Sequence, residues 1–185
     1  KENSTLNENA CLNPISPYSN TKYTIEKILS DLYKSSKGSW RIVSLRYFNP
    51  IGAHPSGLIG EDPKGTPNNL FPLIINTALG LQNKLKIYGN DWPTKDGTPI
   101  RDYIHVMDVA ESHSDILENL FYKDKCHFYL NIGTGIGTTV LELIKVFEKV
   151  NNVKVPYVFT ERREGDSCCV IADNKLLVSK FNFKP

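Results

Sequence analysis

Apolar residues recur at helical spacing in several segments of the chain. The first segment spans residues 17–34, where apolar side chains at positions 25, 28, 29 and 32 share one helical face. Pro17 stands at its start, and the fixed φ of proline suits the first turn of a helix. Similar periodicity predicts helices over residues 69–79, 108–120 and 139–150. Gly80 would end the second helix, and Thr139 and Glu142 would form a capping box at the start of the last.

Short apolar runs between these helices predict β-strands. They cover residues 41–48, 85–88, 103–106, 128–132 and 155–160, and Asn49-Pro50 is expected to stop the first strand. Strands that alternate with helices are typical of an α/β fold. Two long polar loops, 50–67 and 89–98, interrupt the pattern. Ordered loops of this length are usually functional, so we expect ligand contacts there.

The composition is that of an ordinary globular protein. Of the 185 residues, 40% are hydrophobic and 23% are charged, and the net charge is +2. Such a mild and well-mixed charge does not indicate a nucleic-acid or membrane surface. The longest apolar runs, such as residues 70–75, are too short to span a bilayer. We therefore expect neither nucleic acid nor a membrane as a partner.

The cysteines and histidines show no metal-binding pattern. Cys11, Cys126, Cys168 and Cys169 contain no Cys-x-x-Cys pair, and the four histidines form no cluster. Free thiols are typical of a reducing compartment, which favours a cytoplasmic location. We interpret the adjacent Cys168 and Cys169 as packing residues, because neither has the partners of a nucleophile.

The two ends of the chain do not resemble those of a complete protein. There is no initiator methionine, and the chain begins in a polar, loop-like stretch. It ends at residues 181–185 without an obvious terminating element. We expect the sequence to be one piece of a longer protein.

Tyr18 and Lys22 are the first candidates for catalytic chemistry. They are four residues apart at the start of a predicted helix, so their side chains share one face. An ammonium beside a phenol favours the phenolate, which can act as a general base. A tyrosine and a lysine at this spacing are also common on helix surfaces. The pair alone therefore does not decide between the two interpretations.

The run from Pro17 to Lys22 resembles the Tyr-x-x-x-Lys motif of the short-chain dehydrogenase/reductase superfamily. Later runs make the resemblance more specific. Residues 45–54 and 61–70 are similar to segments of nucleotide-sugar epimerases, and residues 89–106 look like a signature of the UDP-glucose 4-epimerase family. The run Arg162-Arg163-Glu164-Gly165-Asp166 closes the series. The resemblance thus covers nearly the whole chain.

This resemblance implies an α/β protein that forms the carboxyl-terminal part of a Rossmann-type, NAD-dependent epimerase. Residues 1–50 would complete the NAD-binding domain and carry the Tyr-x-x-x-Lys helix. Residues 51–185 would mainly form a smaller α/β domain that binds the UDP-sugar, with some segments returning to the Rossmann core. The dinucleotide fingerprint and a catalytic Ser or Thr would lie upstream, so this piece alone would be inactive. Family members often form homodimers, which we also expect by analogy.

The implied reaction interconverts UDP-galactose and UDP-glucose by transient oxidation at sugar C4. Its cofactor would be tightly bound NAD, and its substrate a UDP-hexose. Tyr18 and Lys22 would be the catalytic residues, and both would contact NAD together with Phe48.

The resemblance also implies a set of substrate-binding residues. Arg101 and Arg163 suit a diphosphate, because guanidinium offers a planar fork of donors to its oxygens. Asp166 would accept hydrogen bonds from a ribose diol. Val170 would border the sugar's 2-substituent, and it is smaller than the tyrosine of narrow-specificity members, so N-acetylated sugars are expected to fit. The remaining contacts would come from Asn49, Asn69, Leu70, Lys86, Ile87, Tyr88 and Tyr103.

Simpler interpretations stay open for single residues. Arg101-Asp102 could be a surface ion pair, and Asn49-Pro50 could only end a strand. The glycine-rich run 133–137 lies between a strand and a helix, but its third glycine comes one place early for a dinucleotide fingerprint. We interpret that run as a structural turn. Two other functions also stay open: another nucleotide-sugar epimerase or dehydratase of the same family, or a UDP-sugar-binding module without catalysis.

Overall fold

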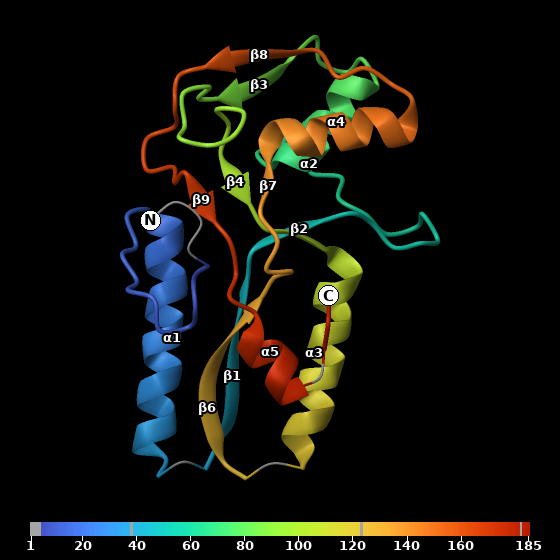
Figure 1. The fold of residues 1–185 in the computed structure, drawn as a ribbon. Helices are drawn as coiled ribbons and strands as arrows, with labels where there is room; N and C mark the ends of the chain where they lie inside the picture. The colour runs from blue at the N-terminus through green and yellow to red at the C-terminus, as the bar shows by residue number, and fades with distance from the viewer. Residues whose placement is uncertain (1–4, 38, 123, 182) are drawn as a thin grey trace.

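The computed structural model describes residues 5–37, 39–122, 124–181 and 183–185. It is a mixed α/β structure with several parallel strand pairs, as the alternating pattern predicts. In the orientation of Figure 1, a lower region and an upper region are joined by short strands. No helix in the described part of the chain is long and apolar enough to cross a membrane.

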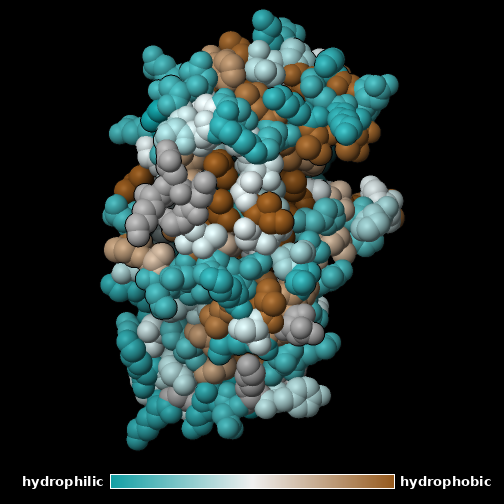
Figure 2. Space-filling view, viewed as in Figure 1, coloured by the Kyte–Doolittle hydropathy of each residue, from teal (hydrophilic) through white to brown (hydrophobic). Residues whose placement is uncertain are grey.

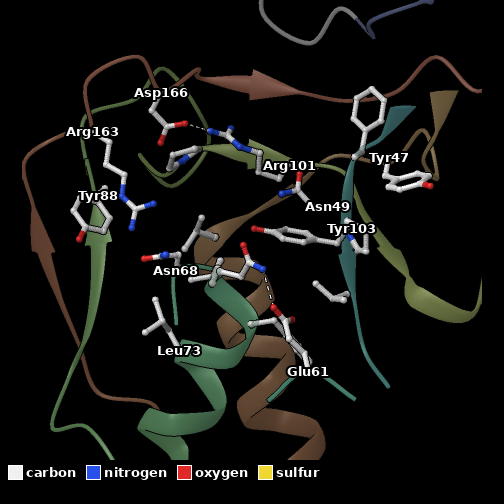
Figure 3. A pocket seen from close by; sticks show the side chains of 18 of the residues that line it. Tyr47, Asn49, Glu61, Asn68, Leu73, Tyr88, Arg101, Tyr103, Arg163 and Asp166 are labelled. Atoms are coloured by element: carbon white, nitrogen blue, oxygen red, sulfur yellow. Dashed lines mark hydrogen bonds and ion pairs between the residues drawn. The ribbon is translucent and has the colours of Figure 1, made fainter. Parts of the chain in front are cut away.

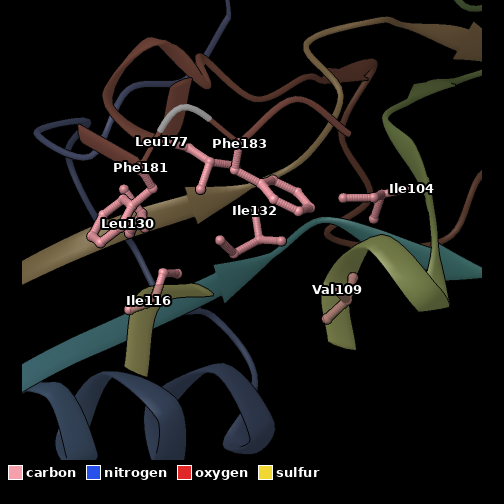
Figure 4. Packing of buried hydrophobic residues seen from close by; sticks show 8 residues of the cluster. All are labelled: Ile104, Val109, Ile116, Leu130, Ile132, Leu177, Phe181 and Phe183. Atoms are coloured by element: carbon pink, nitrogen blue, oxygen red, sulfur yellow. The ribbon is translucent and has the colours of Figure 1, made fainter. Parts of the chain in front are cut away.

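The lower region has three layers. Strands β1 (Arg41–Tyr47) and β6 (Cys126–Ile132) pair in parallel along their whole lengths. Helix α1 (Pro17–Ser35) lies on one side of this pair, and α3 (Val106–Phe121) and α5 (Lys175–Phe181) lie on the other (Figure 1). The core fills the space between the strands and the latter two helices (Figure 4). It contains Ile104, Val109, Ile116, Leu130, Ile132, Leu177, Phe181 and Phe183.

Helix α1 begins at Pro17, as predicted from the sequence. Its N-cap is Ser16, whose hydroxyl accepts from the Ser19 N–H, while the Ser19 hydroxyl accepts from the Ser16 N–H. This reciprocal capping box satisfies two backbone donors at the helix start. It fixes the first turn, which carries Tyr18.

The upper region packs two helices on a second parallel strand pair. Strands β3 (Leu85–Tyr88) and β8 (Tyr157–Thr160) are covered by α2 (Leu70–Ala78) and α4 (Val140–Asn151). The capping box predicted for Thr139 and Glu142 is present at the start of α4. The shared core consists of Ile74, Leu85, Ile87, Leu141, Ile144 and Val155. Brown, apolar residues also reach the surface beside α4 (Figure 2), where Val146 is 57% exposed.

Short strands connect the two regions. Strand β2 (Asn49–Ile51) pairs in parallel with β5 (Tyr103–His105). Strand β4 (Ile100–Arg101) lies between β7 (Thr138–Thr139) and β9 (Cys169–Val170). The polar loops thereby bring residues from distant parts of the sequence to one junction.

Asp102 is a structural residue of this junction. It is fully buried, and its carboxylate accepts hydrogen bonds from the backbone N–H groups of Thr134, Gly135 and Ala172 at 2.9, 2.9 and 3.1 Å. The interpretation of Arg101-Asp102 as a surface ion pair is therefore wrong. The N–H groups of the glycine-rich turn bind a carboxylate of their own chain, which confirms that run 133–137 is a structural turn. A Cβ on Gly133 would lie 2.7 Å from Asp102 Oδ2, so only glycine fits there.

The first strand ends just before Asn49-Pro50, as expected, because β1 stops at Tyr47. A new strand then begins, since the Asn49 N–H donates to the Asp102 carbonyl at 3.0 Å at the start of β2. The pattern predicted neither β2 nor β9 and α5, which follow β8 (Tyr157–Thr160). Elements this short have too few residues to show a period, and their pairing depends on tertiary neighbours.

Candidate functional site

A pocket of about 530 Å³ lies at the junction between the upper and lower regions. Figure 3 shows Arg163 and Tyr88 at one side, Tyr47 at the other, and Arg101, Asn49 and Tyr103 between them. Most of the predicted site residues meet here although they are far apart in the sequence. They are Tyr18, Phe48, Asn49, Asn69, Leu70, Lys86, Tyr88, Arg101, Tyr103, Arg163 and Asp166.

Three predicted residues do not line the pocket. Lys22 lies one helical turn behind Tyr18, and its Nζ is 5.4 Å from the centre of the Tyr18 ring. The Ile87 side chain is 1% exposed and belongs to the upper core, which leaves only its backbone available to a ligand. Val170 is half-buried in β9, opposite Arg101 of β4.

The prediction missed several wall residues. They are Tyr47, Pro50, Ile51, Glu61, Asn68, Phe71, Leu73, Pro99 and Val140. Tyr47 and Asn68 are next to predicted residues in the same motifs, so the sequence could have indicated that they line the pocket. Glu61 lies inside a long loop expected to hold ligand contacts. Val140 arrives from α4, which no local pattern connects to this pocket.

The two predicted arginines lie in different electrostatic environments. Arg101 forms an ion pair with Asp166 and donates to the Ile100 carbonyl at 2.7 Å. The Arg163 guanidinium lies 3.9 Å from the centre of the Tyr88 ring, and no carboxylate of the described residues pairs with it. Its N–H donors are therefore free to bind an anion such as a phosphate.

Tyr103 lies beside the Arg101–Asp166 pair in the pocket wall. Burial is the main effect that raises the pKa of its phenol to about 12; Arg101 opposes the shift and Asp166 adds to it. Tyr103 therefore keeps its proton near neutral pH. It can serve as a hydrogen-bond donor, which distinguishes it from a general base.

The neighbouring loop is fastened by Arg162. Its guanidinium stacks 4.0 Å from the Trp92 ring and donates to the Asp91 carboxylate and carbonyl at 2.8 and 2.7 Å. The hydrogen bond from Arg162 is the main cause that holds the pKa of Asp91 below its usual value. The adjacent arginines thus differ: Arg162 binds the loop that carries Asp91 and Trp92, and Arg163 lines the pocket.

Tyr18 and Tyr47 also line the pocket, and Figure 3 shows Tyr47 on the side away from Arg163. The Tyr18 side chain is 73% exposed. The Tyr47 hydroxyl lies 2.7 Å from His113 Nε2, and His113 Nδ1 lies 2.7 Å from the Val109 carbonyl. Because a carbonyl only accepts, Nδ1 carries the hydrogen that is donated to Val109, and Nε2 forms the hydrogen bond with the Tyr47 hydroxyl. His113 therefore holds the Tyr47 ring at the edge of the pocket.

Arg46 connects the Tyr18 helix to the strand that leads into the pocket. Its Nε and Nη2 donate to the two carboxylate oxygens of Glu26 in α1, at 2.8 and 2.7 Å. Its Nη1 donates to the Glu8 carbonyl at 2.9 Å, and its guanidinium lies 4.5 Å from the Tyr129 ring centre. A two-pronged pair of this kind restricts both the distance and the orientation of α1.

Within the described ranges, no group of three or more His, Cys, Asp or Glu residues could hold a metal ion. The four cysteines are free thiols. The polar and ionisable groups that line the pocket are the tyrosines, Lys86, the two arginines, the asparagine amides and the carboxylates of Glu61 and Asp166, with Lys22 behind Tyr18.

Comparisons with known proteins agree with this geometry. The NAD dependent epimerase/dehydratase family matches residues 1–133. The UDP-glucose 4-epimerase of Bacillus subtilis (strain 168) is 49% identical over 172 residues, covering 93% of this chain and 50% of the relative. The UDP-glucose 4-epimerase of Drosophila melanogaster is 50% identical over 173 residues, covering 93% and 49%.

Two solved structures are similar over essentially the whole chain. The UDP-glucose-4-epimerase from Stenotrophomonas maltophila, crystallised with NAD and formylated UDP-arabinopyranose, is 43% identical with a TM-score of 0.94 and covers 100% of this chain and 54% of its own. The enzyme from Bifidobacterium longum, in complex with NAD+ and UDP, is 40% identical with a TM-score of 0.91, covering 99% and 54%. The chain spans about half the length of the curated relatives that it matches. It belongs to the NAD dependent epimerase/dehydratase family.

Proposed function

We propose that this chain supplies the UDP-sugar site and the catalytic tyrosine and lysine of an enzyme that interconverts UDP-galactose and UDP-glucose. One observation carries the proposal: Tyr18 opens onto the same pocket as Arg101, Arg163 and Asp166. A general base therefore faces a site with donors for a diphosphate and an acceptor for a ribose. The similar proteins named UDP-glucose 4-epimerase support the same reaction.

The polar groups of the pocket suggest how the ligand is oriented. Arg163 has unpaired donors for the diphosphate, and Arg101 can contribute N–H groups that Asp166 does not use. Asp166 accepts from the ribose diol, and the backbone of residues 86–88 with Tyr103 borders the uracil. Asn49 and Asn69 offer amide donors to the phosphates, and Leu70 lines the same pocket, with the hexose between the phosphates and Tyr18.

Tyr18, Tyr47 and Phe48 fit part of an NAD site. Tyr18 is 73% exposed, and all three line the pocket, which leaves an accessible aromatic surface for a nicotinamide. Phe48, Tyr18 and Lys22 would hold the cofactor there. NAD, when bound, supplies the oxidation and reduction of the sugar at C4.

The side chains perform the proton transfer. Tyr18 Oη accepts the proton of the sugar 4-hydroxyl as the 4-keto sugar forms. The Lys22 ammonium stabilises the negative charge of the phenolate. The 4-keto sugar then turns within the pocket, and Tyr18 returns the proton to the new 4-hydroxyl. An upstream Ser or Thr would complete the site by polarising the 4-oxygen.

The remaining expectations belong to the same proposal. Residues 1–50 would complete a NAD-binding domain, and residues 51–185 would mainly form the UDP-sugar domain. Free thiols favour a cytoplasmic location. The apolar residues exposed along α1 suit a homodimer in which two such helices pack together.

The test is a product assay on the protein encoded by the complete reading frame. It is incubated with UDP-galactose without added NAD, and the products are separated by chromatography. Appearance of UDP-glucose is the expected result, because the cofactor stays bound between turnovers. If UDP binds but no epimer forms, a sister reaction or a binding function replaces the proposal.

Val170 concerns the width of the substrate range. It is half-buried in β9 and pairs with Arg101, which lines the pocket, and we place it at the border of the sugar's 2-substituent. We expect the protein to convert both UDP-galactose and UDP-N-acetylgalactosamine. Val170→Tyr should lower turnover of the N-acetylated sugar by about tenfold or more, the discrimination that a steric clash of a few atoms gives. Unchanged turnover of that sugar would eliminate Val170 as a gate.

A further inference from the structure

Glu61 is a carboxylate of the pocket wall without an assigned role. It comes from the long loop between β2 and α2, and Oε1 accepts a hydrogen bond of 2.7 Å from Asn69 Nδ2 (Figure 3). The other carboxylate of the wall, Asp166, is paired with Arg101. No cation of the described residues pairs with Glu61, so the Asn69 amide is its partner there.

Asn69 occupies a position where its side chain would normally bond elsewhere. It is the N-cap of α2, with extended backbone angles of φ −83° and ψ 146°, yet its side chain makes no capping hydrogen bond. Asparagine is among the residues that cap helices best, by accepting from the second or third N–H of the helix. The third residue is Pro72, which has no N–H, so only Phe71 could donate. The hydrogen bond between Asn69 and Glu61 therefore competes with only one possible capping hydrogen bond, from the Phe71 N–H.

The chemistry of the two groups fixes the direction of the amide. A carboxylate can only accept, so Asn69 must point its NH₂ group toward Glu61. One N–H is used in this contact, which leaves the second N–H and the carbonyl Oδ1 for a ligand in the pocket. Without Glu61, the amide could rotate, reverse or cap α2, and its orientation toward the ligand would be lost.

We propose that Glu61 is a positioning residue for the nucleotide sugar, acting through Asn69. It rests on the proposed function, because the ligand is the UDP-sugar of this pocket. Glu61 holds the Asn69 amide in the orientation that binds the ligand and keeps that side chain off the cap of α2. Its negative charge has no direct attractive role, since a carboxylate repels a diphosphate.

If Glu61 positions Asn69, its hydrogen bond and not its negative charge should determine the affinity for UDP. Glu61→Gln keeps an acceptor oxygen of the same reach and removes the charge, so the Kd for UDP should stay within about threefold of the parent value. Glu61→Ala removes the acceptor, and the Kd should rise about tenfold, as expected for one well-placed hydrogen bond. Asp62→Ala is the matched control, because Asp62 is the next residue of the same exposed loop and does not line the pocket. It should leave the Kd unchanged.

The experiment is a calorimetric titration of the full-length protein with UDP, using these three variants, Asn69→Ala and the double variant Glu61→Ala/Asn69→Ala. If Glu61 acts through Asn69, Glu61→Ala has less than a twofold effect once Asn69 is alanine. The melting temperature of Glu61→Ala should stay within about 2 °C of the parent, as for other surface substitutions. A purely structural role would instead lower it together with the affinity.

The outcomes distinguish the inference from the function it rests on. A parent protein that does not bind UDP contradicts the proposed function. A parent that binds UDP while Glu61→Ala binds equally well overturns only the positioning role of Glu61. The same holds if the two single effects simply add in the double variant, because Glu61 would then act independently of Asn69.

Discussion

The helices of the upper region and helix α1 of the lower region are held against the strands by different means. In the upper region, α2 and α4 bury apolar side chains such as Ile74 and Ile144, which are 0% and 1% exposed, in one core. In the lower region, α1 has no buried side chain, and its Ile25 and Ile28 are 46% and 60% exposed. Helix α1 is instead held by the Arg46–Glu26 pair and by the contact of Tyr33 with His127, whose ring centres are 5.6 Å apart.

This difference divides the pocket into two walls. The wall with Arg163, Tyr88 and Asn69 rests on elements that share a buried apolar core within this chain. The wall with Tyr18 stands on a helix whose apolar residues face outward, where a further part of the protein or a second copy could cover them. Substitutions in the two walls should therefore affect binding and turnover differently.

The largest effect on turnover should come from Tyr18→Phe, which tests whether the wall with Tyr18 supplies the general base. Removing the hydroxyl removes the general base, so turnover by the full-length protein should fall by about 10³-fold or more. The Kd for UDP should change by less than about threefold, because the wall with Arg163, Tyr88 and Asn69 is intact.

A matched control for this variant lies on the same helix. Lys27 Nζ is 5.4 Å from the Tyr23 ring centre, the same distance as in the Tyr18–Lys22 pair, but Tyr23 does not line the pocket. Tyr23→Phe should retain turnover. If both variants lose turnover equally, the effect belongs to the helix and not to the Tyr18 hydroxyl.

Arg163→Met tests the opposite wall. The methionine can keep the apolar contact with Tyr88 but loses the donors for the diphosphate. The Kd for UDP should rise about 10- to 100-fold, the range for hydrogen bonds between charged groups, with a smaller change in kcat. Arg162→Met is the control, because Arg162 is engaged with Asp91 and Trp92 and should mainly affect stability. Similar losses of UDP affinity in both variants would contradict a distinct role for Arg163.

Glu26→Gln tests whether the ion pair with Arg46 stabilises the packing of α1 against the strands. The pair with Arg46 is mostly shielded from water, with the two side chains 17% and 19% exposed. Losing the charge-assisted pair should lower the free energy of unfolding by about 1–3 kcal/mol, measured by urea denaturation. Asp31→Asn removes an exposed charge from the same helix and should change it by less than about 0.5 kcal/mol. Equal effects would mean that Arg46 does not anchor α1.

Burial of Tyr103 in the pocket wall should make the stability of the protein depend on pH. The pKa of Tyr103 is about 12 in the folded protein, against about 10 in an unfolded chain. Between these values the unfolded state loses its proton first, so the free energy of unfolding falls as pH rises, by up to about 1 kcal/mol per pH unit. Tyr103→Phe should make the decline shallower in urea titrations from pH 9 to 11.5. Parallel curves would show that Tyr103 ionises as readily as an exposed tyrosine.

The residues most readily predicted were those inside continuous motifs. The start of α1 at Pro17 and the capping box at Thr139 follow from local backbone chemistry, so the structure confirms both. The residues of the pocket were predicted within their runs for the same reason, because each motif is contiguous. Burial of the Ile87 side chain could have been anticipated from strand alternation, since Lys86 and Tyr88 on either side face the pocket.

The sequence by itself determined the α/β pattern, the starts of α1, α2 and α4, and the Tyr18–Lys22 face, because these depend on neighbours within a few residues. The start of α3 was predicted two residues too late, and α5 was not predicted. Only the tertiary structure decided that Glu61 meets Asn69, that Arg46 holds α1, and that Asp102 is buried beneath a glycine turn. The strands β2, β4, β7 and β9 also belong to this second group. Their partners lie tens of residues away, and a contact across such a separation leaves no periodic trace in the local sequence.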